Sequence, residues 1–285
     1  MIYESIYSSF NSNDEVKQNI ESYIRRENLL NSTEYTINDD LSIDVHGGLY
    51  LMNLNWTGRI PIRFGKIDGN VNIEGCNNLT NLKGFPTYVK GDIKINYNPK
   101  LESLEGCLIK ETNGEFDCSK NKLTSLEGGP KIVEMSYDCI DNQLTTLKGC
   151  PEKIGSGFHA GSNKLTEIDF CPKECRVANF SNNYNLISIK KFPEKCIRVD
   201  FSWTKLLSLK GLENVEGLEE VYVANSPLVS IFGGRIKDIS MIKHFISFKV
   251  VDGDTININR LKYFQSIYTE ILIRDVSLKA WYKLK

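Results

Sequence analysis

Eight cysteines are the residues of this sequence that could most readily do chemistry, either as zinc ligands or as nucleophiles. Cys171 and Cys175 form one pair of possible ligands, but no second pair follows at metal-ligand spacing. With 285 residues, the chain is also too long for its cysteines to indicate a small disulfide scaffold. We therefore expect free cysteines that act as small buried hydrophobes, and with them a reducing compartment.

Other potential catalytic or ligand-binding residues are isolated from one another. The three histidines, His46, His159 and His244, lie far apart in the sequence. The segment Gly155-Ser156-Gly157 lacks the Gly-Lys-Ser/Thr of a phosphate-binding loop, and Asp252-Gly253-Asp254 is too short for a calcium loop. The sequence thus predicts no catalytic residue, no metal site and no cofactor.

Composition narrows the class of partner. Lys and Arg total 35 against 36 for Asp and Glu, which gives a net charge of −1 and no general attraction to nucleic acid or an anionic membrane. Hydrophobic residues make up 41% of the chain, but they form no run of the ~20 apolar residues that span a bilayer. Residues 1–13 lack the basic and apolar regions of a secretory signal. We expect a cytoplasmic protein that binds neither nucleic acid nor membrane.

A repeat organises the chain and must position any functional residue. Segments that begin at Asn121, Asn142 and Asn163 share the pattern Asn-x-Leu-x-x-Leu/Ile at intervals of 21 residues. An earlier copy occupies residues 78–86, a degenerate first copy occupies residues 49–61, and later copies match less closely. About nine units of roughly 21 to 23 residues result.

Each unit contains an apolar-x-apolar segment, which predicts a short strand with one buried face. So short a strand is unstable alone, but stacked copies form a continuous parallel sheet whose inward residues share one core. The predicted inward pairs are Val71/Ile73, Ile93/Ile95, Phe116/Cys118, Tyr137/Cys139, Phe158/Ala160, Ala178/Phe180, Val199/Phe201 and Val221/Val223.

Two further columns of the repeat have physical causes. The asparagines (Asn121, Asn142, Asn163 and Asn183) should bond backbone groups buried at the turn after each strand, and Thr204 and Ser226 depart from this column. Prolines forbid a regular helix on the return limb, which we expect to be extended or 3₁₀-like. Seven of the eight cysteines also fall on apolar columns, and only Cys76 lacks such a position.

These columns resemble leucine-rich repeat proteins, in particular the short-repeat class of bacterial type III effectors and of proteins encoded by tailed phages. The resemblance covers about residues 48–240. It implies an α/β-type solenoid with a parallel β-sheet on its concave face, extended or 3₁₀ return limbs and a helical N-terminal cap. It also implies a protein-binding solenoid, without identifying the partner.

The flanking segments should cap the exposed ends of the core. Residues 1–47 predict an N-terminal cap, with an amphipathic helix over Asp14–Leu30, an N-cap at Asn13 or Asp14, and strands over 35–37 and 41–45. Residues 48–240 form the solenoid. Residues 241–285 predict a C-terminal cap with a strand pair around Asp252-Gly253-Asp254 and a helix from Leu261 to Ile271.

The exposed face of the sheet is the candidate binding surface, because residues between the inward pairs project from its concave side. Glu115, Asp117 and Asp138 should form a central acidic patch, and Trp203 and Tyr222 are typical interface anchors. The alternative is a charged face that only keeps the sheet edge and surface solvated. The predicted protein-binding residues are Asp92, Lys94, Glu115, Asp117, Asp138, His159, Asp200, Trp203 and Tyr222.

The sequence thus favours a non-enzymatic protein–protein interaction module whose partner has a basic surface. A module of this kind made by a phage would modulate or inhibit a host protein. Two alternatives stay open, a structural or assembly component of a virion and the substrate-recognition part of an effector enzyme. Ligase effectors with similar repeats carry a catalytic cysteine in a separate later domain, whereas no cysteine follows Cys196 here.

Overall fold

The computed structural model describes residues 2–7, 12–30, 34–207, 209–212, 214–226, 230–231, 234–235, 251–252, 255–257 and 259. The chain divides into two compact units, Met1–Gln143 with Lys148–Ile154 (unit 1) and Leu144–Leu147 with Gly155–Lys285 (unit 2). In each unit the repeats form a parallel β-solenoid of stacked coils, with about 8 turns in all. The ninth expected copy, from Leu228, lies mostly outside the described residues.

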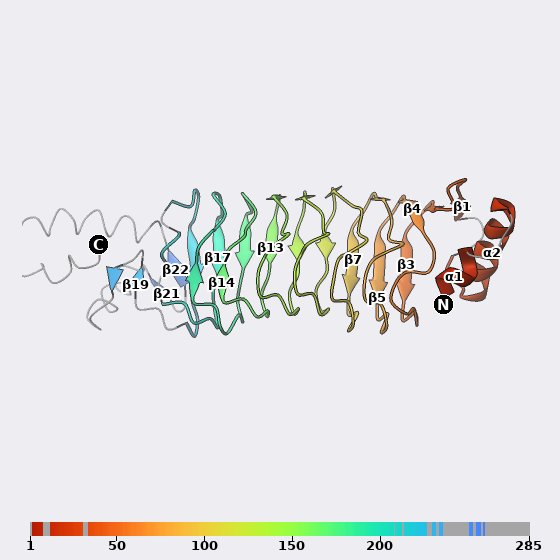
Figure 1. Cartoon of the computed structure of the whole chain (residues 1–285). Coiled ribbons are helices and arrows are strands. Elements are labelled where there is room, and N and C mark those ends of the chain that lie inside the picture. The colour runs from red at the N-terminus through yellow and green to blue at the C-terminus, as the bar shows by residue number, and fades with distance from the viewer. Residues whose placement is uncertain are drawn as a thin grey trace, which may run out of the picture. The chain divides into compact units, whose positions relative to one another are not determined.

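Unit 1 contains a sheet of parallel strands that lie side by side in Figure 1. Every neighbouring pair in this sheet is in register along the repeat, as in Val71↔Ile93 and Ile93↔Phe116. In order, the strands are β3 (Leu49–Met52), β5 (Val71–Glu74), β7 (Ile93–Asn96), β9 (Phe116–Asp117) and β11 (Tyr137–Asp138).

Unit 2 repeats this arrangement with parallel strands β13 (Gly157–His159), β15 (Val177–Asn179), β17 (Arg198–Asp200) and β18 (Glu220–Tyr222). An antiparallel strand, β22 (Thr255–Asn257), pairs with β18 and with β21 (Val251–Asp252). The strand pair expected around residues 253–254 is therefore confirmed. A short antiparallel pair, β19 (Ser230–Ile231) and β20 (Gly234–Arg235), completes the described strands. The helix expected from Leu261 lies outside the described residues.

The predicted inward residues form the core of each unit. All of them are buried except Val223, which is half-buried. Aromatic rings of successive coils stack, with centroids 5.2 Å apart for Phe116 and Tyr137 and 5.7 Å apart for Phe180 and Phe201. The core is therefore a column of like residues, as expected when identical coils lie on one another.

The return limbs are extended and carry short parallel strands of their own. In unit 1 these are β4 (Phe64–Ile67) and β6 (Tyr88–Val89), then β8 (Glu111–Thr112), β10 (Ile132–Val133) and β12 (Lys153–Ile154). In unit 2 they are β14 (Glu167–Ile168) and β16 (Ser188–Ile189). No 3₁₀ segment occurs among the residues that the structure describes. The class shown is thus a β-solenoid with few helices, and the finer expectation of an α/β-type class is not confirmed.

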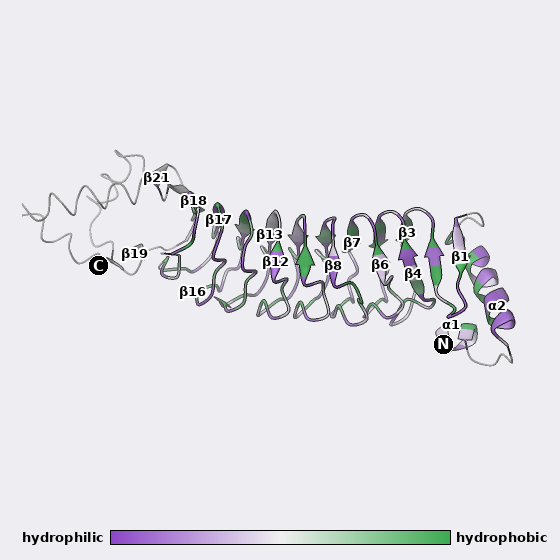
Figure 2. Cartoon of the chain, turned by 90° about the horizontal axis from the view of Figure 1, so that it is seen from above, coloured by the Kyte–Doolittle hydropathy of each residue, from purple (hydrophilic) through white to green (hydrophobic). Residues whose placement is uncertain are grey.

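The N-terminal segment holds two helices, α1 (Ile2–Tyr7) and α2 (Asn13–Arg26). The sequence predicted α2 but not α1. The N-cap of α2 is Ser12, whose Oγ accepts a hydrogen bond from the Glu15 N–H (3.3 Å), so the expected caps at Asn13 or Asp14 are wrong. The helix also ends four residues early, because Asn28 takes a left-handed φ of 51°. Figure 2 shows hydrophobic and hydrophilic residues alternating along α2.

A hairpin and one buried hydrogen bond attach this segment to the solenoid. The expected strands are present as β1 (Tyr35–Ile37) and β2 (Ile43–Val45), which pair antiparallel. β2 then pairs in parallel with β4 of the return limb. The indole Nε1–H of Trp56 donates to the hydroxyl of Tyr23 on α2 (2.9 Å).

The asparagine column is buried and fully bonded, as expected. The Asn121 side-chain amide donates to the carbonyls of Ile95 (2.6 Å) and Cys118 (2.9 Å), and its Oδ1 accepts from the Asn98 N–H (2.8 Å). Each amide thus links its own coil to the preceding one. The same pattern recurs at Asn98, Asn142, Asn163 and Asn183.

Hydrogen bonds with the backbone explain the positions where another residue replaces the asparagine. Cys76 occupies the asparagine position, since its N–H donates to Asn98 Oδ1 (3.0 Å), which accounts for the one cysteine without a column. At the other end, the hydroxyls of Thr204 and Ser226 both donate to the Phe201 carbonyl, at 2.8 and 2.7 Å. A hydroxyl there supplies the donor that the amide supplies elsewhere.

Candidate protein-binding face

Unit 1 carries an unbroken row of outward side chains on consecutive strands. Tyr50, Asn72, Lys94, Asp117 and Asp138 are register partners in that order. Neighbours in such a row lie about 4.8 Å apart. The row is therefore fixed by backbone pairing, and three of the predicted site residues stand next to one another in it.

Asp117 and Asp138 also close the turns after their strands. Asp117 Oδ1 accepts from the Ser119 N–H (2.9 Å), and its Oδ2 accepts from the Asn96 amide (2.9 Å). Asp138 Oδ1 accepts from the Ile140 N–H (2.9 Å). A short polar side chain that accepts from the N–H two residues ahead stabilises a turn. Both carboxylates are thus held in fixed positions by the backbone.

Asp92 and Glu115 form a second outward row, two residues before Lys94 and Asp117. The Glu115 N–H donates to Asp92 Oδ1 (2.9 Å), which joins the two coils at the start of their strands. Lys94 is exposed and is the register partner of Asp117. The structure therefore gathers the five predicted residues of unit 1 on one surface, which we call the unit 1 face: Asp92, Lys94, Glu115, Asp117 and Asp138.

Unit 2 carries an equivalent row, in which His159, Asn179, Asp200 and Tyr222 are register partners. Asp200 Oδ1 accepts from the Ser202 N–H (2.7 Å) and so repeats the turn-closing role of Asp117. Gly157 leaves room for the His159 ring, because a Cβ there would lie 2.4 Å from Nε2.

An ion pair lies beside this row. Arg198 Nε is 3.0 Å from Glu220 Oε2, and the Tyr222 hydroxyl donates to the same oxygen (3.0 Å). This hydrogen bond to Glu220 raises the pKa of Tyr222. Arg198 and Glu220 were not among the predicted site residues, although their place two residues before Asp200 and Tyr222 could have identified them. We call the set His159, Arg198, Asp200, Glu220 and Tyr222 the unit 2 face.

Trp203 lies on the turn that follows β17 and is half exposed (50%). Its φ is 60°, in the left-handed region that disfavours a bulky side chain. The equivalent turn position is Ser162, Asn182 and Asn225 in other coils of the unit. A tryptophan that is both exposed and conformationally costly is not explained by folding alone.

Sequence reasoning did not predict the outward residues of β3, the first strand of the main sheet in unit 1. Tyr50 and Met52 on β3 are 60% and 46% exposed and point outward between the buried Leu49 and Leu51. The alternation of these four residues was the signal that could have found them.

The cysteines have the environment of packing residues. All eight are free, and only Cys150 is not fully buried. Burial raises the pKa of Cys107 to about 11 and those of Cys118 and Cys139 well above the usual range. Within the described residues, no group of three or more His, Cys, Asp and Glu side chains could hold a metal ion.

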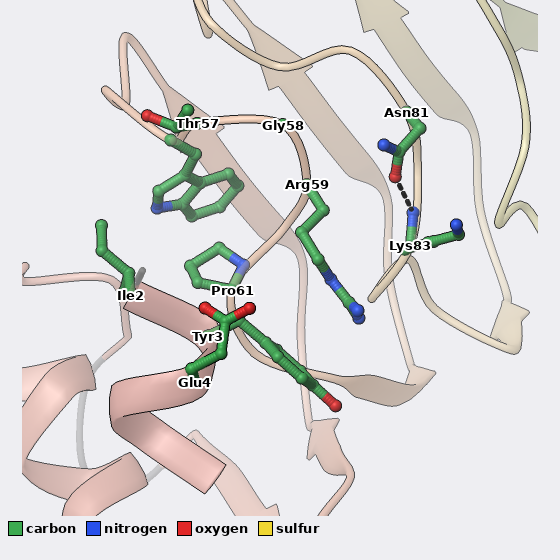
Figure 3. Close-up of a pocket in the computed structure, with 10 residues that line it drawn as sticks. Ile2, Tyr3, Glu4, Thr57, Gly58, Arg59, Pro61, Asn81 and Lys83 are labelled. Carbon is green, nitrogen blue, oxygen red and sulfur yellow. Dashed lines mark hydrogen bonds between the residues drawn. The ribbon is translucent and has the colours of Figure 1, made fainter. Parts of the chain in front are cut away.

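A pocket of about 460 Å³ lies between α1 and the first repeat of unit 1 (Figure 3). The Arg59 guanidinium stacks 3.9 Å from the ring centroid of Tyr3, and Lys83 Nζ pairs with Glu105 Oε1 (2.7 Å). Both cations of the pocket are thus engaged with protein groups. None of the predicted site residues lines it, and we assign it to the docking of α1.

The fold and its outward rows define a parallel β-solenoid repeat protein. No protein-family model and no curated protein matches the chain. Among the described residues, no helix has the length and apolar character needed to cross a membrane.

Proposed function

We propose that this protein is a non-enzymatic interaction module that binds a partner protein through the unit 1 and unit 2 faces. The observation that carries the proposal is the row of register-matched outward side chains on β7, β9 and β11. A rigid sheet presents such side chains at fixed spacing, so little conformational entropy is lost when a partner binds.

The chemistry of the two faces favours a particular partner. Four of the five residues of the unit 1 face are carboxylates, and Asp92, Asp117 and Asp138 are held by backbone N–H groups. Preorganised carboxylates favour a partner with a basic surface, because complementary charges raise the rate and the specificity of association. In unit 2, Tyr222 and Trp203 supply the aromatic residue types that often anchor interfaces.

We further infer that the solenoid belongs to the short-repeat leucine-rich class. Support comes from the Leu-x-x-Leu pairs, which are buried in successive coils, and from the bonded asparagine column. A cytoplasmic location is proposed on the eight free thiols. Phage origin, with a host protein as the target, rests on the resemblance alone.

Affinity purification with the full chain tests the proposal. The test variant is Asp117→Asn with Asp138→Asn, because an asparagine can still accept the turn hydrogen bond while both charges are removed. The matched control is Glu105→Gln with Glu127→Gln, which removes the same charge from residues that pair with Lys83 and Lys148 elsewhere on unit 1.

Wild type and the control should recover the same protein from a lysate of the producing cells, and the test variant should recover at least about tenfold less. Equal recovery by wild type, control and test variant would reject the unit 1 face as the binding surface. If wild type retains no protein above an empty matrix, the interaction module itself is contradicted.

A further inference from the structure

Cys175 and Cys196 occupy equivalent positions on adjacent coils of unit 2. The residues just before them, Glu174 and Lys195, are partners in a parallel β-bridge. The Cys175 N–H donates to the Lys195 carbonyl (3.1 Å), which fixes the register at the cysteines themselves. Adjacent parallel strands are about 4.8 Å apart, and a disulfide needs Cα atoms roughly 4.4 to 6.8 Å apart.

The two thiols also contact each other. A hydrogen bond between them lowers the pKa of Cys196 and raises that of Cys175, so the pair favours one thiolate at Cys196. In the thiol form, the Cys196 Sγ–H donates to the Arg198 carbonyl (3.1 Å). Cys175 and Cys196 are both buried, with 5% and 1% of their surface exposed. Thiolates, not thiols, are the species that react with oxidants.

We propose that Cys175 and Cys196 form a redox-sensitive pair that a peroxide converts to an intrachain disulfide. The Cys196 thiolate attacks one peroxide oxygen, the O–O bond breaks, and a sulfenic acid and one water form. The Cys175 sulfur then attacks the sulfenic sulfur, the S–O bond breaks and the second water leaves. Two thiols are oxidised to one disulfide while one peroxide is reduced to two waters.

A second cysteine pair in unit 1 provides an internal comparison. Cys118 and Cys139 follow the register partners Asp117 and Asp138, so they are also neighbours on adjacent coils. Both are 0% exposed, and burial raises the pKa of each thiol. This pair has the same spacing as Cys175 and Cys196 but offers no accessible thiolate, so we expect it not to react with peroxide.

The disulfide would join the coil of β15 to that of β17. These strands carry Asn179 and Asp200, and Cys196 lies two residues before Arg198 of the unit 2 face. A bond between positions 175 and 196 closes a loop of one repeat and restricts the unfolded chain. Oxidation should therefore stabilise unit 2 without rearranging its surface.

The test treats the reduced full chain with hydrogen peroxide, alkylates the remaining thiols and digests with trypsin without reduction. Cleavage after Lys173, Arg176, Lys195 and Arg198 gives one peptide for each cysteine, 174–176 and 196–198. We expect these two peptides to be joined in a dose-dependent manner and separated by dithiothreitol. The first thermal unfolding midpoint should rise by about 5 °C on oxidation.

Two variants make the result specific. Cys118→Ser should keep both the linked peptide and the shift in midpoint, and Cys175→Ser should lose both. The proposal is overturned if peptides 174–176 and 196–198 stay separately alkylated in oxidised wild type. It is equally overturned if Cys175 is linked to Cys171, or if Cys118 and Cys139 are linked as readily. These outcomes are read on the wild-type chain and do not depend on either variant folding.

Discussion

Asp117 and Asp138 are register partners on adjacent parallel strands, and each accepts a hydrogen bond from the backbone N–H two residues ahead, at 2.9 Å. Two carboxylates are therefore held side by side on the unit 1 face. The role in the turn requires an acceptor but no charge. The turn thus explains why Asp or Asn occupies this position of the repeat. It does not require the negative charge, which we attribute to binding.

Substitutions at Asp138 separate the turn from the charge. Asp138→Asn keeps an acceptor for the Ile140 N–H and should change the free energy of unfolding by less than about 0.5 kcal/mol. Asp138→Ala leaves that N–H without its acceptor and should cost about 1 kcal/mol. Urea unfolding followed by circular dichroism measures both. Equal losses in the two variants would show that the turn does not depend on the hydrogen bond.

Removal of one asparagine of the buried column should be costly. Asn121→Ala deletes bonds to the Ile95 and Cys118 carbonyls and to the Asn98 N–H, all of them buried. We expect a loss of about 3 kcal/mol. Lys122→Ala, at the exposed neighbouring position, serves as the control and should be nearly neutral. A small effect at Asn121 would contradict the view that these amides join the coils.

Trp203 should behave in opposite ways in stability and in binding. Trp203→Asn places in the left-handed position the residue found at Asn182 and Asn225. It should stabilise the fold by about 1 kcal/mol and reduce partner recovery. Thermal unfolding and affinity purification measure the two effects. If the variant is less stable, Trp203 contributes packing and its conformation needs another explanation.

A glycine of the return limb is required by close approach between coils. Gly106 has a φ of 94°, and a Cβ there would lie 2.3 Å from the backbone nitrogen of Lys83. Gly106→Ala should cost about 3 kcal/mol, from the left-handed conformation together with the clash. Gly58→Ala is the control, since φ is 84° but open space surrounds its Cβ, and it should cost about 1 kcal/mol. Chemical denaturation measures the free energy of unfolding of both variants. Equal losses in the two would show that the clash with the preceding coil does not contribute to the cost of Gly106→Ala.

The burial of Tyr23 predicts a loss of stability at high pH. Burial raises the pKa of Tyr23 to about 12, from an ordinary value near 10. Because the folded pKa is the higher one, the stabilisation is complete below pH 10 and is lost as the pH rises from 10 to 12. Unfolding curves at pH 8, 10 and 11.5 should show this decline in wild type and a smaller one in Tyr23→Phe. An identical decline in both would assign the effect to other groups.

The sequence was informative about the core because the core repeats. A strand of two to four residues can bury its side chains only against copies of itself, so the inward columns had to recur at the repeat period. That reasoning found every strand of the main sheets from β5 to β18, and it found the buried asparagine column apart from Asn98. It placed the caps of α2 less well, although Ser12 and Glu15 have the Ser-x-x-Glu spacing of a capping box, which could have identified Ser12 as the N-cap.

What the amino-acid sequence alone determined is therefore the stacking of coils and which residues face inward, since hydrophobic burial depends on residue type and spacing. Only the tertiary structure decided which side chains meet across coils. Because the repeats are of unequal length, the sequence spacing between equivalent residues changes from coil to coil while the strands stay in register. Backbone pairing confirms that Asp117 stands beside Asp138, and it alone reveals that Cys76 holds an asparagine position.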